Sequence, residues 1–250
     1  MNIRAYGTDA RLGFCREYLL NENITGVREI ILLPIPTSRD GKTLTGLEKS
    51  PEELLRGDFS GAVAVGYEIP RAFREYFSGL GISVADVSLD EDFLLENAAL
   101  TAVGAVGKIL SEYSAAPSEL SLGVVGYGRI GKRLLNILAF LGADLTVFTT
   151  KKAVAEELCM EGISGVCLSD TAGEELSGIL SHIDVLINTA PSEIFTSEVL
   201  EAFGGEILEL ASGNNFPSGV KVTRLAALPA KMYPKSAGKA LAASVVRMIG

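Results

Sequence analysis

Residues 120–131 read LSLGVVGYGRIG, and this stretch decides the fold. An apolar run leads into Gly126, Gly128 and Gly131, which have the spacing of the dinucleotide fingerprint G-x-G-x-x-G. A helical pattern follows, and then a second apolar run at 145–148. Strand, glycine turn, helix and strand in this order predict a nucleotide-binding Rossmann unit. A glycine-rich turn that binds nothing is the alternative.

Each glycine of this turn has its own role in the fingerprint. Gly126 permits the tight turn, Gly128 lets the backbone approach a pyrophosphate, and Gly131 lets the helix pack closely on the strand. The start of the helix then offers N–H groups and the positive end of its dipole to the phosphates. The predicted cofactor contacts are therefore the whole turn: Gly126, Tyr127, Gly128, Arg129, Ile130 and Gly131.

The end of the second strand predicts which nicotinamide cofactor binds. A unit that prefers NAD carries Asp or Glu about 20 residues past the fingerprint, where the carboxylate accepts hydrogen bonds from the ribose. This chain has Thr149, Thr150, Lys151 and Lys152 there instead. Hydroxyl and ammonium groups would hold a 2′-phosphate by charge-assisted hydrogen bonds, so we expect NADP in preference to NAD. Alternatively, the two lysines are solvated and pair with glutamates one helical turn further on.

Two later loops are expected to complete the cofactor site. Ligands of open α/β sheets bind at the carboxyl ends of the strands. Segment 188–192 follows a predicted strand and should line the nicotinamide-ribose end of the groove, and 211–215 follows the next strand. A simple turn is the alternative reading of the first segment. The cofactor-binding residues predicted in these loops are Asn188, Thr189, Ala190, Pro191, Ala211 and Ser212.

Composition places the chain among ordinary globular proteins. It has 250 residues, of which 48% are hydrophobic and 21% charged, enough for one large or two modest domains. The net charge of −9 argues against a nucleic-acid or anionic-membrane surface. No apolar run reaches the roughly 18 residues of a membrane span. The three cysteines lack metal-ligand spacing, so we expect reduced thiols, a cytoplasmic location and no metal site.

The part of the chain before the fingerprint also alternates strands and helices, which predicts a second parallel sheet with helices on both faces. We therefore expect two doubly wound α/β domains. The first, 1–113, is predicted to be a flavodoxin-like substrate domain that ends in a long helix. The second, 114–235, is predicted to be the Rossmann dinucleotide-binding domain. The last helix, 236–250, is expected to pack back on the first domain.

Polar loops of the first domain and the single histidine bear on the chemistry. Thr37 and Ser38 follow a strand and are expected to hold substrate with hydroxyl and N–H groups. Lys235 is expected either to bind a substrate carboxylate or to be a solvated lysine. His182 lies at the amino end of a strand, the edge away from catalysis, which excludes dehydrogenases that need a histidine in their later loops. The chain has too few metal-ligating side chains with suitable spacing for a catalytic zinc, which excludes zinc dehydrogenases. The sequence assigns no catalytic residue.

The order of motifs along nearly the whole chain resembles the A subunit of dipicolinate synthase. Besides the fingerprint, the resemblance is carried by Gly7-Thr8-Asp9-Ala10-Arg11, Ile31-Leu32-Leu33-Pro34, 97–104, Asn188-Thr189-x-Pro191, Leu208-Glu209-Leu210-Ala211-Ser212, Leu228-Pro229 and Pro234-Lys235-Ser236-Ala237-Gly238. The last of these is the most distinctive. The chain departs from the family at Leu100, Val103 and Gly213, where the family has Pro, Glu and Arg.

This resemblance implies an enzyme that oxidises dihydrodipicolinate, a small dicarboxylate, to dipicolinate with NADP. It also implies a partner, the flavoprotein-like B subunit, and a role in sporulation, and it implies substrate contacts at Arg11, Thr37, Ser38, Thr101 and Lys235. Two alternatives stay open. The departures favour a related enzyme acting on another small carboxylic acid, and the scarcity of acid–base residues favours a non-catalytic subunit that binds NADP. The expected oligomeric state is a homodimer.

Overall fold

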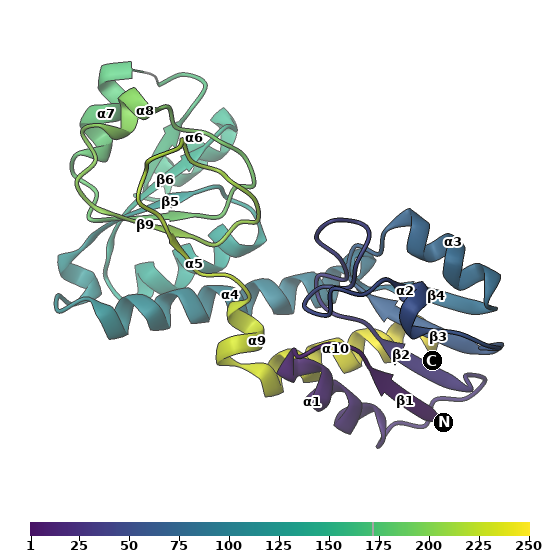
Figure 1. Cartoon of the computed structure of the whole chain (residues 1–250). Coiled ribbons are helices and arrows are strands. Elements are labelled where there is room, and N and C mark those ends of the chain that lie inside the picture. The colour runs from purple at the N-terminus through teal and green to yellow at the C-terminus, as the bar shows by residue number, and fades with distance from the viewer. Residues whose placement is uncertain (172) are drawn as a thin grey trace. The chain divides into compact units, whose positions relative to one another are not determined.

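The computed structural model describes residues 1–171 and 173–250, and the chain forms two compact units (Figure 1). The first unit contains 1–100 and 229–250, and the second contains 101–228. From the sequence we expected domains of 1–113 and 114–235. The division by contacts instead falls inside the long helix and ahead of Pro229.

The first unit is built on a sheet of four parallel strands, in the order β1-β2-β3-β4. Its strands are β1 (Asn2–Ala5), β2 (Glu29–Leu32), β3 (Ala62–Gly66) and β4 (Ile82–Asp86). Its helices are α1 (Ala10–Leu19), α2 (Pro51–Leu54), α3 (Arg71–Gly79), the 3-10 turn η1 (Val87–Leu89), the start of α4 (Glu91–Glu112), most of α9 (Leu228–Met232) and α10 (Pro234–Ile249).

Helices cover both faces of this sheet, and the two central strands, β2 and β3, are buried on both sides. On one face, Leu12 and Cys15 of α1 pack with Leu241 of α10 against the strands. On the other face, Phe73 and Phe77 of α3 do the same. Helix α10 therefore packs against α1, and a Cβ on Gly238 would lie 2.7 Å from the carbonyl oxygen of Arg11.

The fold class expected for this unit is confirmed, but its strand order is not that of flavodoxin. Flavodoxin-like sheets run 2-1-3-4-5, whereas this sheet runs 1-2-3-4. The difference arises because β1 pairs with β2 alone, along Asn2–Ala5, and β2 then pairs directly with β3. Strand patterns in the sequence predict that strands exist, but they do not predict which edges pair.

The second unit is a six-stranded parallel sheet in the order β10-β9-β8-β5-β6-β7, which is the Rossmann order. Its strands are β5 (Ser121–Val125), β6 (Asp144–Thr149), β7 (Ser164–Cys167), β8 (Val185–Asn188), β9 (Glu206–Glu209) and β10 (Thr223–Arg224). Its helices are the rest of α4, the 3-10 turn η2 (Pro117–Glu119), α5 (Arg129–Phe140), α6 (Lys152–Met160), α7 (Gly173–Leu180) and α8 (Ser197–Leu200).

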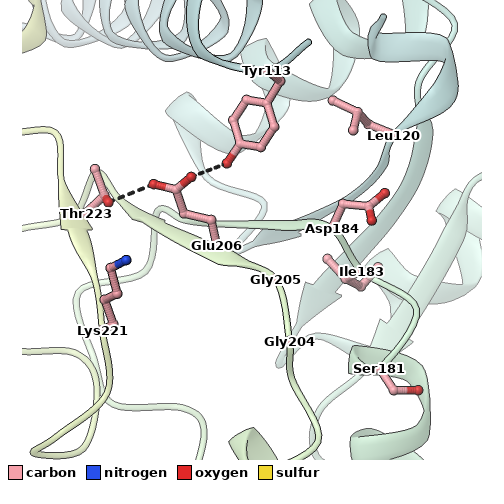
Figure 2. Close-up of a pocket in the computed structure, with 10 residues that line it drawn as sticks. All are labelled: Tyr113, Leu120, Ser181, Ile183, Asp184, Gly204, Gly205, Glu206, Lys221 and Thr223. Atoms are coloured by element: carbon pink, nitrogen blue, oxygen red, sulfur yellow. Dashed lines mark hydrogen bonds between the residues drawn. The ribbon is translucent and has the colours of Figure 1, made fainter. Parts of the chain in front are cut away.

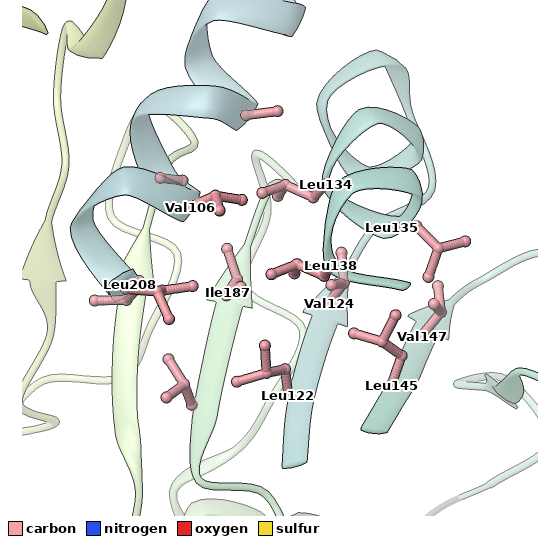
Figure 3. Close-up of a cluster of buried hydrophobic side chains, with 14 of the residues drawn as sticks. Val106, Leu122, Val124, Leu134, Leu135, Leu138, Leu145, Val147, Ile187 and Leu208 are labelled. Atoms are coloured by element: carbon pink, nitrogen blue, oxygen red, sulfur yellow. The ribbon is translucent and has the colours of Figure 1, made fainter. Parts of the chain in front are cut away.

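Figure 3 shows the core between one face of this sheet and helices α4 and α5. Val106 of α4 and Leu134 and Leu138 of α5 lie over strand residues such as Val124 and Ile187. The apolar side chains of α5 recur every three to four residues, so one face of the helix is buried. This packing fixes the start of α5 at the end of β5, where the glycine turn lies.

By length and composition alone, α4 is the one helix in the described part of the chain that could cross a membrane. Core helices of soluble proteins pass the same test. In the second unit Ala102, Ala105, Val106 and Ile109 of α4 are buried in the core. We therefore assign α4 to the protein core.

Candidate cofactor site

The glycine turn between β5 and α5 has the geometry that its sequence predicts. Gly126 has φ +91°, a conformation that favours glycine, and its N–H donates to the carbonyl oxygen of Phe148 at 2.8 Å. A Cβ on Gly131 would lie 2.1 Å from the carbonyl oxygen of Gly126, so α5 can approach the turn only because residue 131 lacks a side chain. A Cβ on Gly128 would meet no atom within 4 Å.

The open space at Gly128 is where a pyrophosphate would lie. Helix α5 begins at Arg129 with Gly128 as its N-cap, and its first intrahelical bond runs from the Lys132 N–H to the Gly128 carbonyl oxygen at 3.0 Å. The first-turn N–H groups, together with the dipole of a 12-residue helix, suit an anion at this point. The exposed Gly128 and Arg129 leave the turn accessible. The residues present therefore fit a dinucleotide.

The side chain of Tyr127, the residue after Gly126, packs against the core of the second unit. Its ring is half-buried against the core, and the ammonium group of Lys132 lies 5.2 Å from the ring centroid. Burial raises the pKa of the Tyr127 hydroxyl, and the charges of Glu161 and Glu157 raise it further. The Tyr127 side chain is therefore neutral at physiological pH, and its ring packs as an apolar group against the core.

The four residues at the end of β6 do not share one environment. Thr149 is buried, and its Oγ1 accepts a hydrogen bond from the N–H of Lys151 at 3.2 Å. Thr150 and Lys151 are exposed. Lys152 forms an ion pair of 2.9 Å with Asp170, which follows β7, and this hydrogen bond raises the pKa of Lys152. The ion-pair partner of Lys152 is therefore Asp170, whereas the alternative interpretation expected a glutamate of α6.

The loop after β8 is fixed to the glycine turn. Asn188 is buried, and its side chain accepts from the N–H of Ala190 at 3.1 Å and donates to the carbonyl oxygen of Ala190 at 3.0 Å. The hydroxyl of Thr189 donates to the carbonyl oxygen of Val125 at 2.8 Å, and it lies 3.3 Å from that of Gly126. Thr189 and Ala190 thus border the turn, and Pro191 is exposed beyond them. These predicted cofactor residues lie together at the carboxyl edge of the sheet.

A buried carboxylate also lies at this edge, which the sequence analysis named within a motif but did not predict as a site residue. Glu209, the last residue of β9, is 2% exposed. Burial raises its pKa, although hydrogen bonds from Asn215, Ala211 and Asn188 oppose that effect. The signal in the sequence was the second of the two acidic residues in the strand EILE, which ends the strand ahead of a polar loop. Ala211 is bonded through its N–H to Glu209, and Ser212 is exposed.

Of the predicted substrate residues in the first unit, two are committed to internal contacts. The Arg11 side chain is 4% exposed, with Nε 2.6 Å from Asp9 and Nη2 3.0 Å from the carbonyl oxygen of Ile35. Thr37 is fully buried, and its Oγ1 accepts from the N–H of Tyr67 at 2.9 Å. Both brace the loop that follows β2.

The remaining predicted substrate residues differ in exposure. Ser38 is half-buried and donates to Asp40 at 3.0 Å in the same loop. Lys235 is exposed in the first turn of α10. Thr101 is 7% exposed in α4 and belongs to the second unit. The structure thus places Arg11, Thr37, Ser38 and Lys235 in one unit and Thr101 in the other.

A pocket of about 620 Å³ lies at the other edge of the second sheet (Figure 2). It is lined by residues at the amino ends of β8, β9 and β10, among them Asp184, Glu206 and Thr223. Exposed His182 is in the turn that leads to the same edge, as predicted. Nucleotides bind at the carboxyl edge of such sheets, so this pocket is not the cofactor site. Over the described ranges, 1–171 and 173–250, no cluster of metal-ligating side chains is found.

Comparison with known proteins gives one sequence relative and many structures. No family model matches the chain. It is 29% identical over 163 residues to the A subunit of dipicolinate synthase from Bacillus subtilis. The chain resembles that protein. The match covers 61% of this chain and 52% of the relative, so it spans about half the length of that A subunit.

Solved structures extend the likeness to the whole fold. The crystal structure of the dipicolinate synthase A subunit from Bacillus halodurans matches with a TM-score of 0.81 at 20% identity, covering 100% of this chain and 97% of that one. A transhydrogenase from Sinorhizobium meliloti matches with a TM-score of 0.65 at 17% identity, covering 98% and 91%. The resemblance predicted from the motifs and the fold class are both confirmed. The fold is one that oxidoreductases use.

Proposed function

We propose that this protein is an NADP-dependent oxidoreductase that oxidises a small dicarboxylate, dihydrodipicolinate, to dipicolinate. The observation that carries the proposal is the glycine turn, because space is left open at Gly128 while Gly126 and Gly131 are closed to any side chain. The likeness to the A subunit of dipicolinate synthase supports the choice of substrate.

The preference for NADP is supported by the charge at the end of β6. Thr150 and Lys151 are exposed where the adenine ribose of a Rossmann cofactor lies, and they offer a hydroxyl and an ammonium group to a 2′-phosphate. Lys152 is partly neutralised by Asp170, so Lys151 supplies most of the positive charge. NAD is the less favoured cofactor.

The reaction is a hydride transfer coupled to aromatisation. A bound nicotinamide cofactor, held by the glycine turn and the loops after β8 and β9, would supply the acceptor for a hydride from a ring carbon. The second hydrogen would leave the ring as a proton to solvent, so that the ring becomes aromatic. The protein's part is to orient the dicarboxylate and exclude water. Exposed Lys235 is the strongest candidate for a direct contact with a carboxylate. Buried Arg11 and Thr37 serve by holding the loop that carries Ser38.

Partners and location belong to the same proposal. By analogy with the A subunit of dipicolinate synthase, we propose that the partner is a B subunit. We also propose that the protein forms a homodimer, acts in sporulation and is located in the cytoplasm. The free thiols of Cys15, Cys159 and Cys167 fit a reducing compartment.

Two alternatives to this function are each supported by a separate observation. Leu100, Val103 and Gly213 depart from the family pattern, which favours a related enzyme with another small acid as substrate. At the carboxyl edge of the second sheet Glu209 is a titratable side chain, but it is buried, which favours a subunit that binds NADP without turnover.

The first test is thermal unfolding with NADPH and NADH in parallel. Ligand at 100 times its dissociation constant stabilises a protein by about 2.7 kcal/mol. We expect a rise in Tm with NADPH at lower concentration than with NADH. No rise with either would overturn the cofactor assignment.

The second test is formation of dipicolinate from dihydrodipicolinate and NADP, with and without a B subunit. The wild type is compared with Lys235→Ala, and we expect the variant to raise KM more than it lowers kcat. Binding of NADPH without dipicolinate formation, or with turnover of another acid, would overturn the substrate assignment and leave the cofactor assignment intact.

A further inference from the structure

Glu209 lies where the two cofactor loops meet. It ends β9 and is paired in register with Asn188, which ends β8. Both side chains are at most 2% exposed. A buried carboxylate is costly unless each of its oxygens has hydrogen-bond donors. The burial of Glu209 therefore calls for a reason beyond packing, whereas Glu206 at the other end of β9 is only half-buried.

The carboxylate collects donors from two segments. Oε1 accepts from the Asn188 side-chain amide and from the N–H of Ala211, each at 2.9 Å. Oε2 accepts from the side-chain amide of Asn215 at 3.2 Å. On the neighbouring strand Arg224 donates to the carbonyl oxygen of Gly213 at 2.6 Å, holding the same loop from its other side.

From Glu209 the contacts continue to the glycine turn. Asn188 is bonded to both backbone groups of Ala190, and Thr189 donates to the last carbonyl of β5. A Cβ on Gly126 would lie 2.8 Å from Thr189 Oγ1 and 3.4 Å from the Ala190 Cβ. The Glu209 carboxylate therefore holds the Asn188 side chain, and Asn188 in turn holds the loop after β8 that borders the glycine turn.

We propose that Glu209 is a positioning residue for the nicotinamide-ribose half of the cofactor, acting through Asn188 on the loop after β8 and through Ala211 and Asn215 on the loop after β9. This rests on the proposed NADP site. Glu209 itself is buried and does not touch the ligand. Its carboxylate keeps both loops in the conformation that accepts the nicotinamide half, and the adenine half binds at the turn and β6 without it.

The test compares two ligands on two variants of one strand. Glu209→Gln replaces an acceptor oxygen with an amide that faces the same donors, and Glu206→Gln makes the same change at the other end of β9. Dissociation constants are measured calorimetrically for NADPH and for adenosine 2′,5′-bisphosphate, which carries only the adenine half. We expect Glu209→Gln to weaken NADPH about tenfold, from the loss of one charge-assisted hydrogen bond, with the bisphosphate unchanged. Glu206→Gln should change neither constant.

Other outcomes separate this inference from the proposed function. Equal weakening of both ligands, or no weakening of NADPH, would refute the positioning role while leaving the cofactor assignment intact. A wild type that binds neither NADPH nor NADH would overturn the cofactor assignment, and the positioning role with it.

A second readout needs no ligand. Amide hydrogen exchange at Thr189 and Ala190 and at 211–215 should quicken about tenfold in Glu209→Gln relative to wild type, and unchanged rates would refute the proposal. If Glu209→Gln does not fold, Asn215→Ala removes the donor to Oε2 together with its bond to the Ser212 carbonyl oxygen, so the affinities for the two ligands and the exchange at Thr189 and Ala190 are then the readouts. It should show about threefold changes in the same directions.

Discussion

The hydroxyl of Tyr113 donates a 2.5 Å hydrogen bond to the carboxylate of Glu206, and so ties the end of α4 to the start of β9 (Figure 2). This bond and one from Thr223 lower the pKa of Glu206 below its usual range. A lowered carboxyl pKa adds stability above the unfolded pKa, and that stability is lost as pH falls through the folded value. We expect Tyr113→Phe to lower the free energy of unfolding by about 1 kcal/mol at pH 7 and by less below about pH 4.

Urea unfolding from pH 3 to pH 8 checks this. The control is Tyr76→Phe, which loses a hydrogen bond of 2.6 Å to the carbonyl oxygen of Leu55, an acceptor that does not titrate. Its effect should be of similar size and independent of pH. A deficit in Tyr113→Phe that stayed constant over the whole range would contradict the assignment.

Three glycine substitutions separate folding from nucleotide binding. In Gly131→Ala the new methyl group would collide with the Gly126 carbonyl oxygen, so we expect a loss of about 1–3 kcal/mol of stability together with loss of NADPH binding. In Gly128→Ala the methyl group enters open space, so stability should hold while NADPH binding weakens at least about tenfold. Gly178→Ala, exposed in α7, should bind normally and gain up to about 1 kcal/mol.

Differential scanning calorimetry and NADPH titration on the same samples measure both effects. Normal NADPH affinity in Gly128→Ala would show that the pyrophosphate does not approach the turn.

Charge at the end of β6 should set the choice between cofactors. Lys151→Glu replaces attraction for a 2′-phosphate by repulsion, so we expect NADPH affinity to fall more than about tenfold while NADH affinity stays within about twofold. Asp170→Asn removes the ion pair that holds Lys152, and it should raise NADPH affinity a few-fold. Competitive titrations at low and high salt test both variants, since the gain should shrink with ionic strength. Equal effects on the two nucleotides would rule out a 2′-phosphate at this position.

The three thiols should differ in reactivity. Burial raises the pKa of the Cys15 thiol to about 12, which keeps it protonated and unreactive at neutral pH. Cys159 is exposed at the end of α6, and Cys167 is 8% exposed. Ellman's reagent at pH 8 should therefore label one thiol rapidly in the native protein and all three after unfolding. Cys159→Ser should abolish the rapid phase, and a rapid phase that persisted would show that another thiol is accessible.

Much of the fold and part of the site can be predicted from the sequence. The apolar runs, the fingerprint and Pro234 at the start of the last helix are local signals, and the elements form where those signals lie. Contacts set by strand register join residues far apart in the sequence, so local signals do not predict them. Glu209 and Asn188 are 21 residues apart, and Lys152 meets Asp170 only because β6 pairs with β7. Thr37 is another contact that the local sequence does not predict, because its hydroxyl oxygen accepts a hydrogen bond from the backbone N–H of Tyr67 on another loop.

The first unit is assembled from two separate stretches of the chain, whereas the second is one uninterrupted stretch between them. On the ribosome residues 1–100 emerge early, yet Leu241 and Val245 of α10, which complete their core, follow only after the whole of the second unit. The Rossmann unit can close as soon as residue 228 has left the exit tunnel. We therefore expect the second unit to complete its core before the first. Until α10 emerges, the residues of α1 that it covers stay open to contact with chaperones and other nascent chains.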